Sequence, residues 1–413
     1  MKTIALSWRY LVSRPLAASL NLLLLSLGLA AITFVLLTRA QIDRAFERDL
    51  AGIDAVVGAK GSPMQLILAG VFHLDVPPGN IPLKAVQALA QDARVAQLIP
   101  LSLGDSVQGF RIVGTTPDYL RHYGVQLAQG KLWQAPMEVV LGVGAAQATG
   151  LQPGQAFAGA HGLGGGGAAH AAHPYRVTGV LAPCGCVLDR LVLTATESVW
   201  AVHEVGHGKA DAHDDHDNDH DVAHEDGHED EQREITLALI RYRSPLAAVS
   251  FPRFVNSTTN LQAAAPALEI TRLLRMVGVG ADVLRGFGAV LLLTAALSVF
   301  IALWNAVRER RADLALLRML GASPARLAGL LLCEALWLAV LASVLGLAGG
   351  HLLTGLLGFL LQAEQSLPLT GWLWLGVEAW VPVIALGVAV LAALPPAFSA
   401  YRVEAGQLLN SKN

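Results

Sequence analysis

The stretch VRERRADLALLRMLGAS, residues 307–323, decides how this chain is built. It mixes charged and apolar residues as an amphipathic helix does, and it lies between two long hydrophobic runs. A protein that only crosses a bilayer has no use for a charged helical connector of this length. A protein that receives force from a soluble partner does. We therefore expect residues 307–326 to form a cytoplasmic coupling helix.

Four hydrophobic blocks surround this connector. They cover residues 16–37, 283–304, 327–350 and 372–393, and each reaches the roughly 20 helical residues that cross a bilayer core of about 30 Å. The hydrophobic content of 54% and charged content of 15% fit such an uneven distribution. The first block exceeds the apolar core of a signal peptide, typically about 7–15 residues, so we expect a retained anchor.

The short connections predict the orientation. Lys2, Arg9 and Arg14 precede the first block, whereas the loop at 362–371 has neither lysine nor arginine. Since basic residues accumulate on the cytoplasmic side, both termini and the connector are expected there. This places a multi-pass protein in a bacterial inner membrane, with residues 39–282 in the periplasm.

The long segment between the first two blocks is expected to form an α+β domain. Short β-type runs are separated by helical stretches at 83–90 and 197–205. The predicted strands are 54–57, 96–103, 110–113, 138–141, 175–181, 191–194 and 235–242. Helical stalks at 41–50 and 267–286 would join this domain to the membrane.

The fold class that results is an α-helical membrane protein with four transmembrane helices and an α+β periplasmic domain inserted between helices 1 and 2. The predicted divisions are 1–38 (tail and first helix), 39–282 (periplasmic domain), 283–306 (second helix), 307–326 (coupling helix), 327–361 (third helix and the helix after it), 362–371 (short periplasmic loop) and 372–413 (fourth helix and tail).

Three local matches suggest a family. The connector from Glu309 to Ser323 is similar to an ERRxEIxxLRxLGAS pattern, with Asp313 where Glu is usual. Residues 54–63, DAVVGAKGSP, match a DxVVGAKGSP pattern, and 395–405 resemble a PAxRAxRxxPxEAL tail without its usual proline and some of its basic residues. With the helix order, the chain resembles the MacB/FtsX-type ABC permeases, also called the type VII or mechanotransmission class.

The resemblance implies a homodimeric permease bound by a dimer of a separate cytoplasmic ABC ATPase. The residues expected to contact the ATPase are Arg308, Glu309, Arg310, Arg311, Asp313 and Arg318. Leu314, Leu317 and Leu320 are expected to anchor the connector to the bundle. The chain itself is not expected to be an enzyme, because the nearest Walker A imitation, residues 124–131, has wrong glycine spacing and Leu132 where Ser or Thr is needed.

Histidine and acid content point to metal. Ten of the thirteen histidines lie between His161 and His228, and residues 201–231 hold twelve acidic residues and one lysine. Imidazole and carboxylate together suit Zn²⁺; a solvated polar loop is the alternative. The candidate ligands are His203, His207, His213, His216, His220, His224 and His228. His161, His170 and His173, around a glycine run, are a candidate accessory contact.

Three other features remain open. His203-Glu204-Val205-Gly206-His207 is formally an HExxH motif, which makes a metalloprotease a remote alternative. Cys184 and Cys186 are expected to form a disulfide or to remain as structural thiols; binding of a soft metal or a redox function is the alternative. Inside the membrane blocks, Glu334 is expected to serve helix packing or dimer contact, and His351 to reach water near the outer end.

The function predicted is a permease subunit that couples a partner ATPase to motion of the periplasmic domain, in zinc homeostasis or under control by metal. No cofactor for catalysis and no nucleic acid partner are expected. Membrane lipid and a periplasmic metal-binding protein or lipoprotein are the further partners expected. Two alternatives stay open: a lipoprotein- or lipid-extracting pump, and a non-transporting regulator of a periplasmic partner.

Overall fold

The computed structural model describes residues 3–13, 15–162, 173–207, 233–309, 316–362 and 369–402. The chain divides into two compact units: a helical unit, residues 1–43 and 276–413, and an α/β unit, residues 44–275. The boundaries fall inside α2 (Pro15–Leu50) and α10 (Pro266–Glu309), each of which is one continuous helix. Both predicted stalks therefore belong to longer helices.

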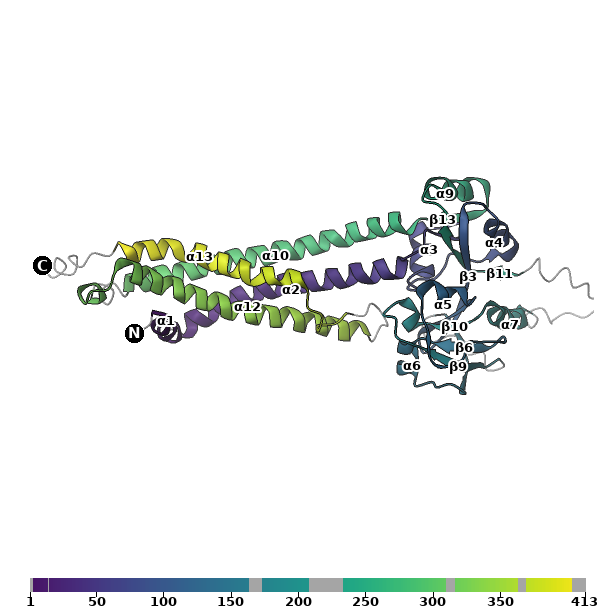
Figure 1. The fold of residues 1–413 in the computed structure, drawn as a ribbon, viewed down its shortest axis with the longest axis horizontal. Helices are drawn as coiled ribbons and strands as arrows, with labels where there is room; N and C mark the ends of the chain where they lie inside the picture. Colours follow the sequence, from purple (N-terminus) through teal and green to yellow (C-terminus); the bar gives the residue numbers. More distant parts are fainter. Residues whose placement is uncertain are drawn as a thin grey trace, which may run out of the picture. The chain divides into compact units, whose positions relative to one another are not determined.

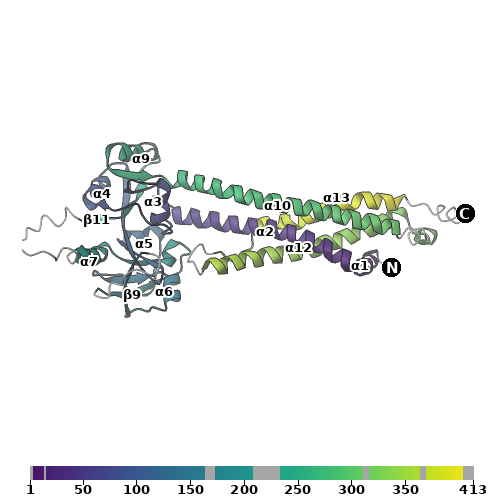
Figure 2. The same cartoon turned by 180° about the vertical axis from the view of Figure 1, so that it is seen from behind.

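The helical unit is built from long apolar helices that lie side by side (Figures 1 and 2). Besides α2 and α10 it contains α1 (Thr3–Val12), α12 (Pro324–Gln362), the short 3₁₀ helix η2 (Gly376–Ala379) and α13 (Trp380–Tyr401). Within the described residues, four segments are long and apolar enough to cross a membrane. They lie in α2, α10, α12 and η2–α13. The first three predicted blocks are thus confirmed as apolar helices. The bounds of the fourth were wrong, because residues 372–375 are not helical and α13 continues to Tyr401. The predicted third helix and the helix after it are one continuous helix, α12.

Small residues let the helices of this unit approach closely. The buried face of α13 carries alanine at about every fourth position, including Ala385, Ala389 and Ala393, and it packs on α12. A Cβ added at Gly346 of α12 would lie 2.5 Å from Leu29 Cβ of α2. In lipid, where water drives no burial between helices, such close packing is what holds a bundle together.

The described residues of the α/β unit form an 11-stranded mixed sheet. Its main path runs β13-β1-β12-β3-β4-β10-β6-β9-β5, with β7 paired to β9 and β8 to β3. Most pairs are antiparallel, but β10 with β4 and β6 with β9 are parallel. A separate pair joins β11 (Glu234–Ile235) to β2 (Ile81–Pro82). The main strands are β1 (Ala55–Ala59), β3 (Val95–Val107), β4 (Phe110–Thr115), β5 (Leu127–Gly130), β6 (Glu138–Leu141), β7 (Ala156–Phe157), β8 (Ala160–His161), β9 (Tyr175–Leu181), β10 (Val192–Ala195), β12 (Leu237–Tyr242) and β13 (Leu261–Ala264).

Helices cover this sheet and close two apolar cores. One core centres on Phe251, Ile240 and Val86, and the other on Ile112, Tyr175 and Val192. The helices of the unit are α3 (Pro63–Gly70), α4 (Leu83–Ala90), α5 (Asp118–Tyr123), α6 (Val143–Thr149), α7 (Thr196–His207) and α9 (Ala247–Thr258), with the 3₁₀ helix η1 (Val187–Arg190). The predicted α+β character of the segment between the first two apolar helices is confirmed.

Candidate functional site

The described part of the connector ends in a hydrogen-bonded helix cap. Residues 316–319 are helical, and Gly321 has a left-handed φ of +91°. The amide of Ala322 donates to Leu317 O at 2.9 Å and that of Gly321 to Arg318 O at 3.1 Å, the two bonds of a Schellman cap. Pro324 then begins α12, a position that suits its missing N–H. The glycine and proline of LGASP therefore fix where the connector stops.

The connector presents apolar as well as charged residues. Leu317 packs against the core of the bundle, as predicted. Leu316 is 50% exposed, Met319 59% and Leu320 80%. The prediction that Leu320 anchors the connector is wrong, because the helix stops at Met319 and the chain turns at Gly321. This leaves an apolar patch of Leu316, Met319 and Leu320 on the connector.

The predicted coupling residues lie at both ends of this segment. Arg308 and Glu309 occupy the last turn of α10 and are exposed, and Arg318 is half-buried in the short helix at 316–319. Arg310, Arg311 and Asp313, with Leu314, lie outside the described residues. The described members are thus at the same end of the helical unit as the apolar patch.

A small, partly polar cavity lies inside the bundle near the connector. It has a volume of about 160 Å³ and is lined by α1, α2, α10 and α12. Its polar lining comes from Asn21, Asn305, Glu309 and Glu334, of which Glu334 is only 7% exposed. Nearby, Ser298 Oγ lies 2.5 Å from Asn21 Oδ1. Glu334 therefore faces the bundle interior, in agreement with the expected packing role.

A second polar cluster closes the opposite end of α12. His351 Nδ1 donates to Gly371 O at 2.7 Å, and its Nε2 lies 2.9 Å from Glu378 Oε2. Glu378 Oε1 accepts from the amide of Leu375 at 2.8 Å, and the imidazole lies against Trp374. Since a carbonyl oxygen only accepts, Nδ1 carries the ring proton of the bond to Gly371.

The same loop is also tied to α2. Gln41 Nε2 donates to Thr370 O at 3.0 Å, and Gln41 Oε1 accepts from Thr370 N at 2.8 Å. The side chain of His351 is 9% exposed and that of Glu378 4%. The expectation that His351 reaches water is therefore wrong: the histidine is buried because Gly371, Trp374 and Glu378 pack against it.

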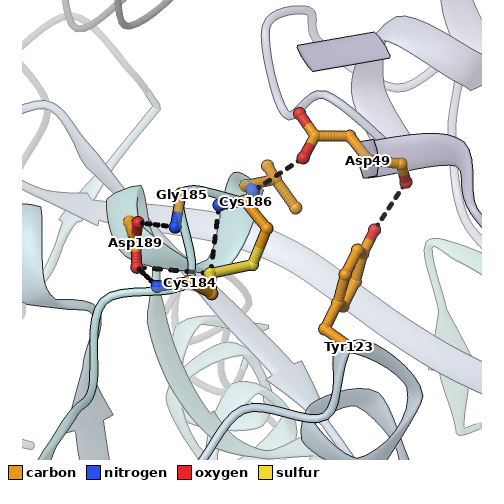
Figure 3. Close-up of a disulfide and its surroundings, with 7 residues drawn as sticks. Asp49, Tyr123, Cys184, Gly185, Cys186 and Asp189 are labelled. Carbon is orange, nitrogen blue, oxygen red and sulfur yellow. Dashed lines mark hydrogen bonds between the residues drawn. A yellow bond between two sulfur atoms is a disulfide. The ribbon is translucent and has the colours of Figure 1, made fainter. Parts of the chain in front are cut away.

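Cys184 and Cys186 are joined as a disulfide across a single glycine, on the loop between β9 and η1 (Figure 3). Asp189 caps this loop, accepting from the amides of Cys184 at 3.0 Å and Gly185 at 2.6 Å. The adjacent amide of Val187 donates to Asp49 Oδ1 at 2.9 Å. Of the alternatives for the two cysteines, the structure has the disulfide.

Most of the predicted metal ligands lie outside the described residues. His203 and His207 lie on α7, while His213, His216, His220, His224 and His228 lie outside the described residues. His161 is on β8, His173 directly precedes β9, and His170 is outside the described residues. In the described ranges, no three His, Cys, Asp or Glu side chains gather as a metal site would require. The zinc site thus stays a prediction.

The Walker A imitation at 124–131 has the wrong context as well as the wrong spacing. Gly124 ends α5 in a left-handed conformation, and Gly130 ends β5. A phosphate-binding loop instead joins a strand to the amino end of a helix, where free amides face the phosphates. This segment therefore cannot cradle a nucleotide.

One buried polar network was not predicted. His73 Nε2 lies 3.1 Å from Tyr119 Oη, and Tyr123 Oη donates to Asp49 O at 2.7 Å, with the two tyrosine rings in edge contact. Burial, aided by the charges of Arg111 and Arg190, holds the pKa of His73 well below its usual value of 6.5. The partners lie too far apart in sequence for any local pattern to connect them.

This architecture defines a multi-pass membrane protein with a large α/β domain between its first two apolar helices. Two family models match it: the MacB-like periplasmic core domain over residues 18–204, and the FtsX-like permease C-terminal over residues 285–405. The chain therefore belongs to the MacB/FtsX-type permease family of ABC transporters. No curated protein matches the chain.

Two solved structures resemble part of the chain. The periplasmic region of MacB from Actinobacillus actinomycetemcomitans is 14% identical, with a TM-score of 0.34 over 55% of this chain and 95% of its own. The extracellular domain of the noncanonic ABC-type transporter YknZ from Gram-positive bacteria is 11% identical, with a TM-score of 0.30 over 51% of this chain and 98% of its own.

Proposed function

We propose that this chain is the transmembrane subunit of an inner-membrane ABC complex, in which a separate cytoplasmic ATPase moves the α/β unit. The observation that carries the proposal is α10. This one helix begins in the α/β unit at Pro266 and ends at the charged connector at Glu309. A continuous helix transmits displacement along its axis better than a flexible linker does.

The connector supports the docking of the ATPase. Its charged residues are joined by the exposed patch of Leu316, Met319 and Leu320. An apolar centre with a charged rim is the usual composition of a protein interface. We infer that the patch enters a groove on the ATPase, with Arg308, Glu309 and Arg318 around it.

The direction of insertion and the assembly complete the proposal. Both termini and the connector are cytoplasmic, following the basic residues of the short connections, and the α/β unit is periplasmic. Two copies of the chain pair in the membrane and bind two ATPase subunits. The chain itself is not catalytic and hydrolyses no ATP.

Zinc enters the proposal through the histidine-rich segment. Seven histidines and twelve carboxylates between residues 201 and 231 supply many donors for a borderline divalent ion. We infer that metal bound there regulates the system or is handled by it in zinc homeostasis.

The test is purification of the full chain from its native membrane, with mass spectrometry of co-purifying proteins and measurement of bound metal. An ABC ATPase should co-purify with the wild type and be lost in the double variant Arg310→Glu/Arg311→Glu. Arg272→Glu, an exposed arginine near the other end of α10, is the matched control and should retain it. Loss of the ATPase in the control, or its absence from the wild type, contradicts the proposal.

The zinc content of the same preparation is measured separately. Zinc should be present in the wild type and depleted by more than half when residues 208–228 are deleted, while the ATPase remains bound. An ATPase without zinc would reduce the histidine-rich segment to a solvated linker and leave the permease assignment standing.

A further inference from the structure

The Cys184–Cys186 disulfide adds little to the global stability of the α/β unit that contains it. A disulfide stabilises mainly by restricting the unfolded chain, and this effect grows with the length of the closed loop. Here the two cysteines are only two positions apart. A bridge this short restricts the unfolded chain far less than one between distant strands.

Hydrogen bonds already hold the same loop. Asp189 accepts from the amides of Cys184 and Gly185, and Cys186 N lies 3.1 Å from Cys184 Sγ. Gly185 has a left-handed φ of +62°, which glycine adopts without strain. The loop conformation therefore has supports other than the sulfur–sulfur bond, and the bond is free to open without loss of the fold.

The two sulfurs differ in access. Cys186 is 6% exposed, whereas Cys184 is half-buried beside the exposed Gly185. Thiol–disulfide exchange requires a thiolate to reach a disulfide sulfur along an open path. Cys184 is therefore the more accessible end of the bridge for such a thiolate.

We propose that Cys184–Cys186 is a redox-exchange site for a dithiol oxidoreductase of the thioredoxin-like class. A thiolate of the partner attacks Cys184 Sγ, the S–S bond breaks, and Cys186 Sγ leaves as a thiolate and takes up a proton. The partner's second thiol then attacks the mixed disulfide and releases Cys184 as a thiol. Two electrons and two protons pass from the partner dithiol to the pair, and the partner is left as a disulfide.

The loop that carries the pair is hydrogen-bonded to the end of α2 (Figure 3). The Val187 amide, next to Cys186, donates to Asp49 Oδ1, and Arg48 Nη1 occupies the space that a Cβ on Gly185 would need. Tyr123 holds the backbone of Asp49 from the other side at 2.7 Å. Opening the bridge relaxes a loop that touches the last turn of the helix, so reduction loosens the hold on Arg48 and Asp49.

The inference rests on the proposed orientation, which puts the pair in the periplasm, where disulfides are made and exchanged. Its test requires no ATPase, so the two can fail independently. The full-length protein carries Cys333→Ser, which removes the remaining cysteine from the readout. It is titrated in detergent with dithiothreitol and labelled with a polyethylene glycol maleimide.

The native protein should take no label before reduction and two labels after it, at dithiothreitol concentrations that leave thermal unfolding unchanged. With Cys186→Ser added, Cys184 should react at least tenfold faster than Cys186 does with Cys184→Ser. Free thiols in the isolated protein, reduction only on unfolding, or faster labelling of Cys186 would overturn the proposal. If a single variant fails to fold, the dithiothreitol titration of the intact pair still tests whether the bridge can be reduced in the folded protein.

Hydrogen exchange measures the consequence for α2. On reduction, amide exchange should speed up at least threefold in peptides covering residues 183–190 and 45–51, and remain constant in the central strand β12. Unchanged exchange at 45–51 would overturn the link between the bridge and the end of α2.

Discussion

His73 is a buried histidine that the fold keeps neutral. Its Nε2 faces Tyr119 Oη, and its Nδ1 has no hydrogen-bond partner among the described residues. A proton taken up by this ring would bring a charge into the interior beside Arg111 and Arg190, which is why its pKa is lowered so far. Its φ of +55° is uncommon for a residue other than glycine.

The contribution of His73 to the stability of the α/β unit should therefore fall in mild acid, whereas Asp49, whose pKa burial raises to about 6, acts in the opposite direction as the pH falls through that value. The unfolded chain binds a proton at His73 below about pH 6.5, whereas the folded chain does not, so the contribution of His73 is complete above pH 6.5 and lost as the pH falls below it. The slope is up to about 1.4 kcal/mol per pH unit for one group. Burial also lowers the pKa of His122, which adds to the slope in the same direction.

The measurement is thermal unfolding of the full chain in detergent between pH 7.5 and pH 5.5. His73→Asn suits the positive φ and removes the titration, so the pH dependence should weaken even though the smaller side chain lowers stability at every pH. His122→Asn, at a less buried ring, is the comparison and should have the smaller effect. An undiminished slope in His73→Asn would refute this account.

At the scale of single elements, the glycines of α12 are of two kinds. An added Cβ at Gly346 or Gly350 would run into Leu29 and Thr33 of α2, whereas at Gly329 it meets no described atom within 4 Å. The absence of a side chain at Gly346 and Gly350 lets α2 and α12 pack in contact. At Gly329 no neighbouring helix in the described part of the chain requires the absence of a side chain. In a helix interior, alanine is otherwise preferred to glycine by about 1 kcal/mol.

Gly346→Ala and Gly350→Ala should therefore destabilise the helical unit, each by about 1–3 kcal/mol, the usual cost of overpacking. Gly329→Ala makes the same chemical change in the same helix and should be neutral or stabilising. Thermal unfolding in a single detergent, followed by tryptophan fluorescence, compares the three. Equal effects at all three positions would mean that α2 and α12 do not pack as described.

Elements with a strong local pattern were predictable from the sequence. The strands Glu138–Leu141 and Tyr175–Leu181 and the helix Leu83–Ala90 have the predicted bounds, because each combines a clear apolar period with turn residues at its ends. β13 was missed since LQAA is rich in alanine, a weak strand former, and its place beside β1 comes from tertiary pairing.

Other elements were missed for local reasons. Pro252 lies inside α9, where proline argues against a helix. α1 was not predicted, because only the charge of the tail before the first apolar block was considered. Pro15, which begins the next helix, was the available signal that a separate element precedes it.

The site was predictable only where its residues are neighbours in sequence. The connector could be predicted from its composition, but its predicted end at residue 326 is wrong, because the helix stops before Gly321 and Pro324 already begins α12. His351 and Glu378 are 27 positions apart, and Asp49 and Val187 are 138 apart. Such pairs depend on how helices and loops fold back on one another, which no local pattern encodes.

At the scale of the whole molecule, α10 has two apolar faces. Leu292, Ala295, Val299 and Leu303 lie in the core of the bundle. The opposite face is a regular exposed stripe with spacings of three, four and seven residues: Val283, Phe287, Val290, Leu297, Ile301 and Trp304. Lipid can cover such a face, but these spacings are also those of a seam between two helices.

The proposed homodimer gives this stripe a partner in the α10 of a second copy. In the Cys333→Ser background, Val290→Cys should then form a disulfide-linked dimer in native membranes on mild oxidation, because Val290 is 57% exposed at the centre of the stripe. Leu352→Cys, from the 69% exposed Leu352 on α12, is the control for random collision and should remain monomeric. Equal cross-linking at both positions, or none at Val290→Cys in membranes where the ATPase still co-purifies, would mean that the stripe faces lipid and that two copies meet elsewhere.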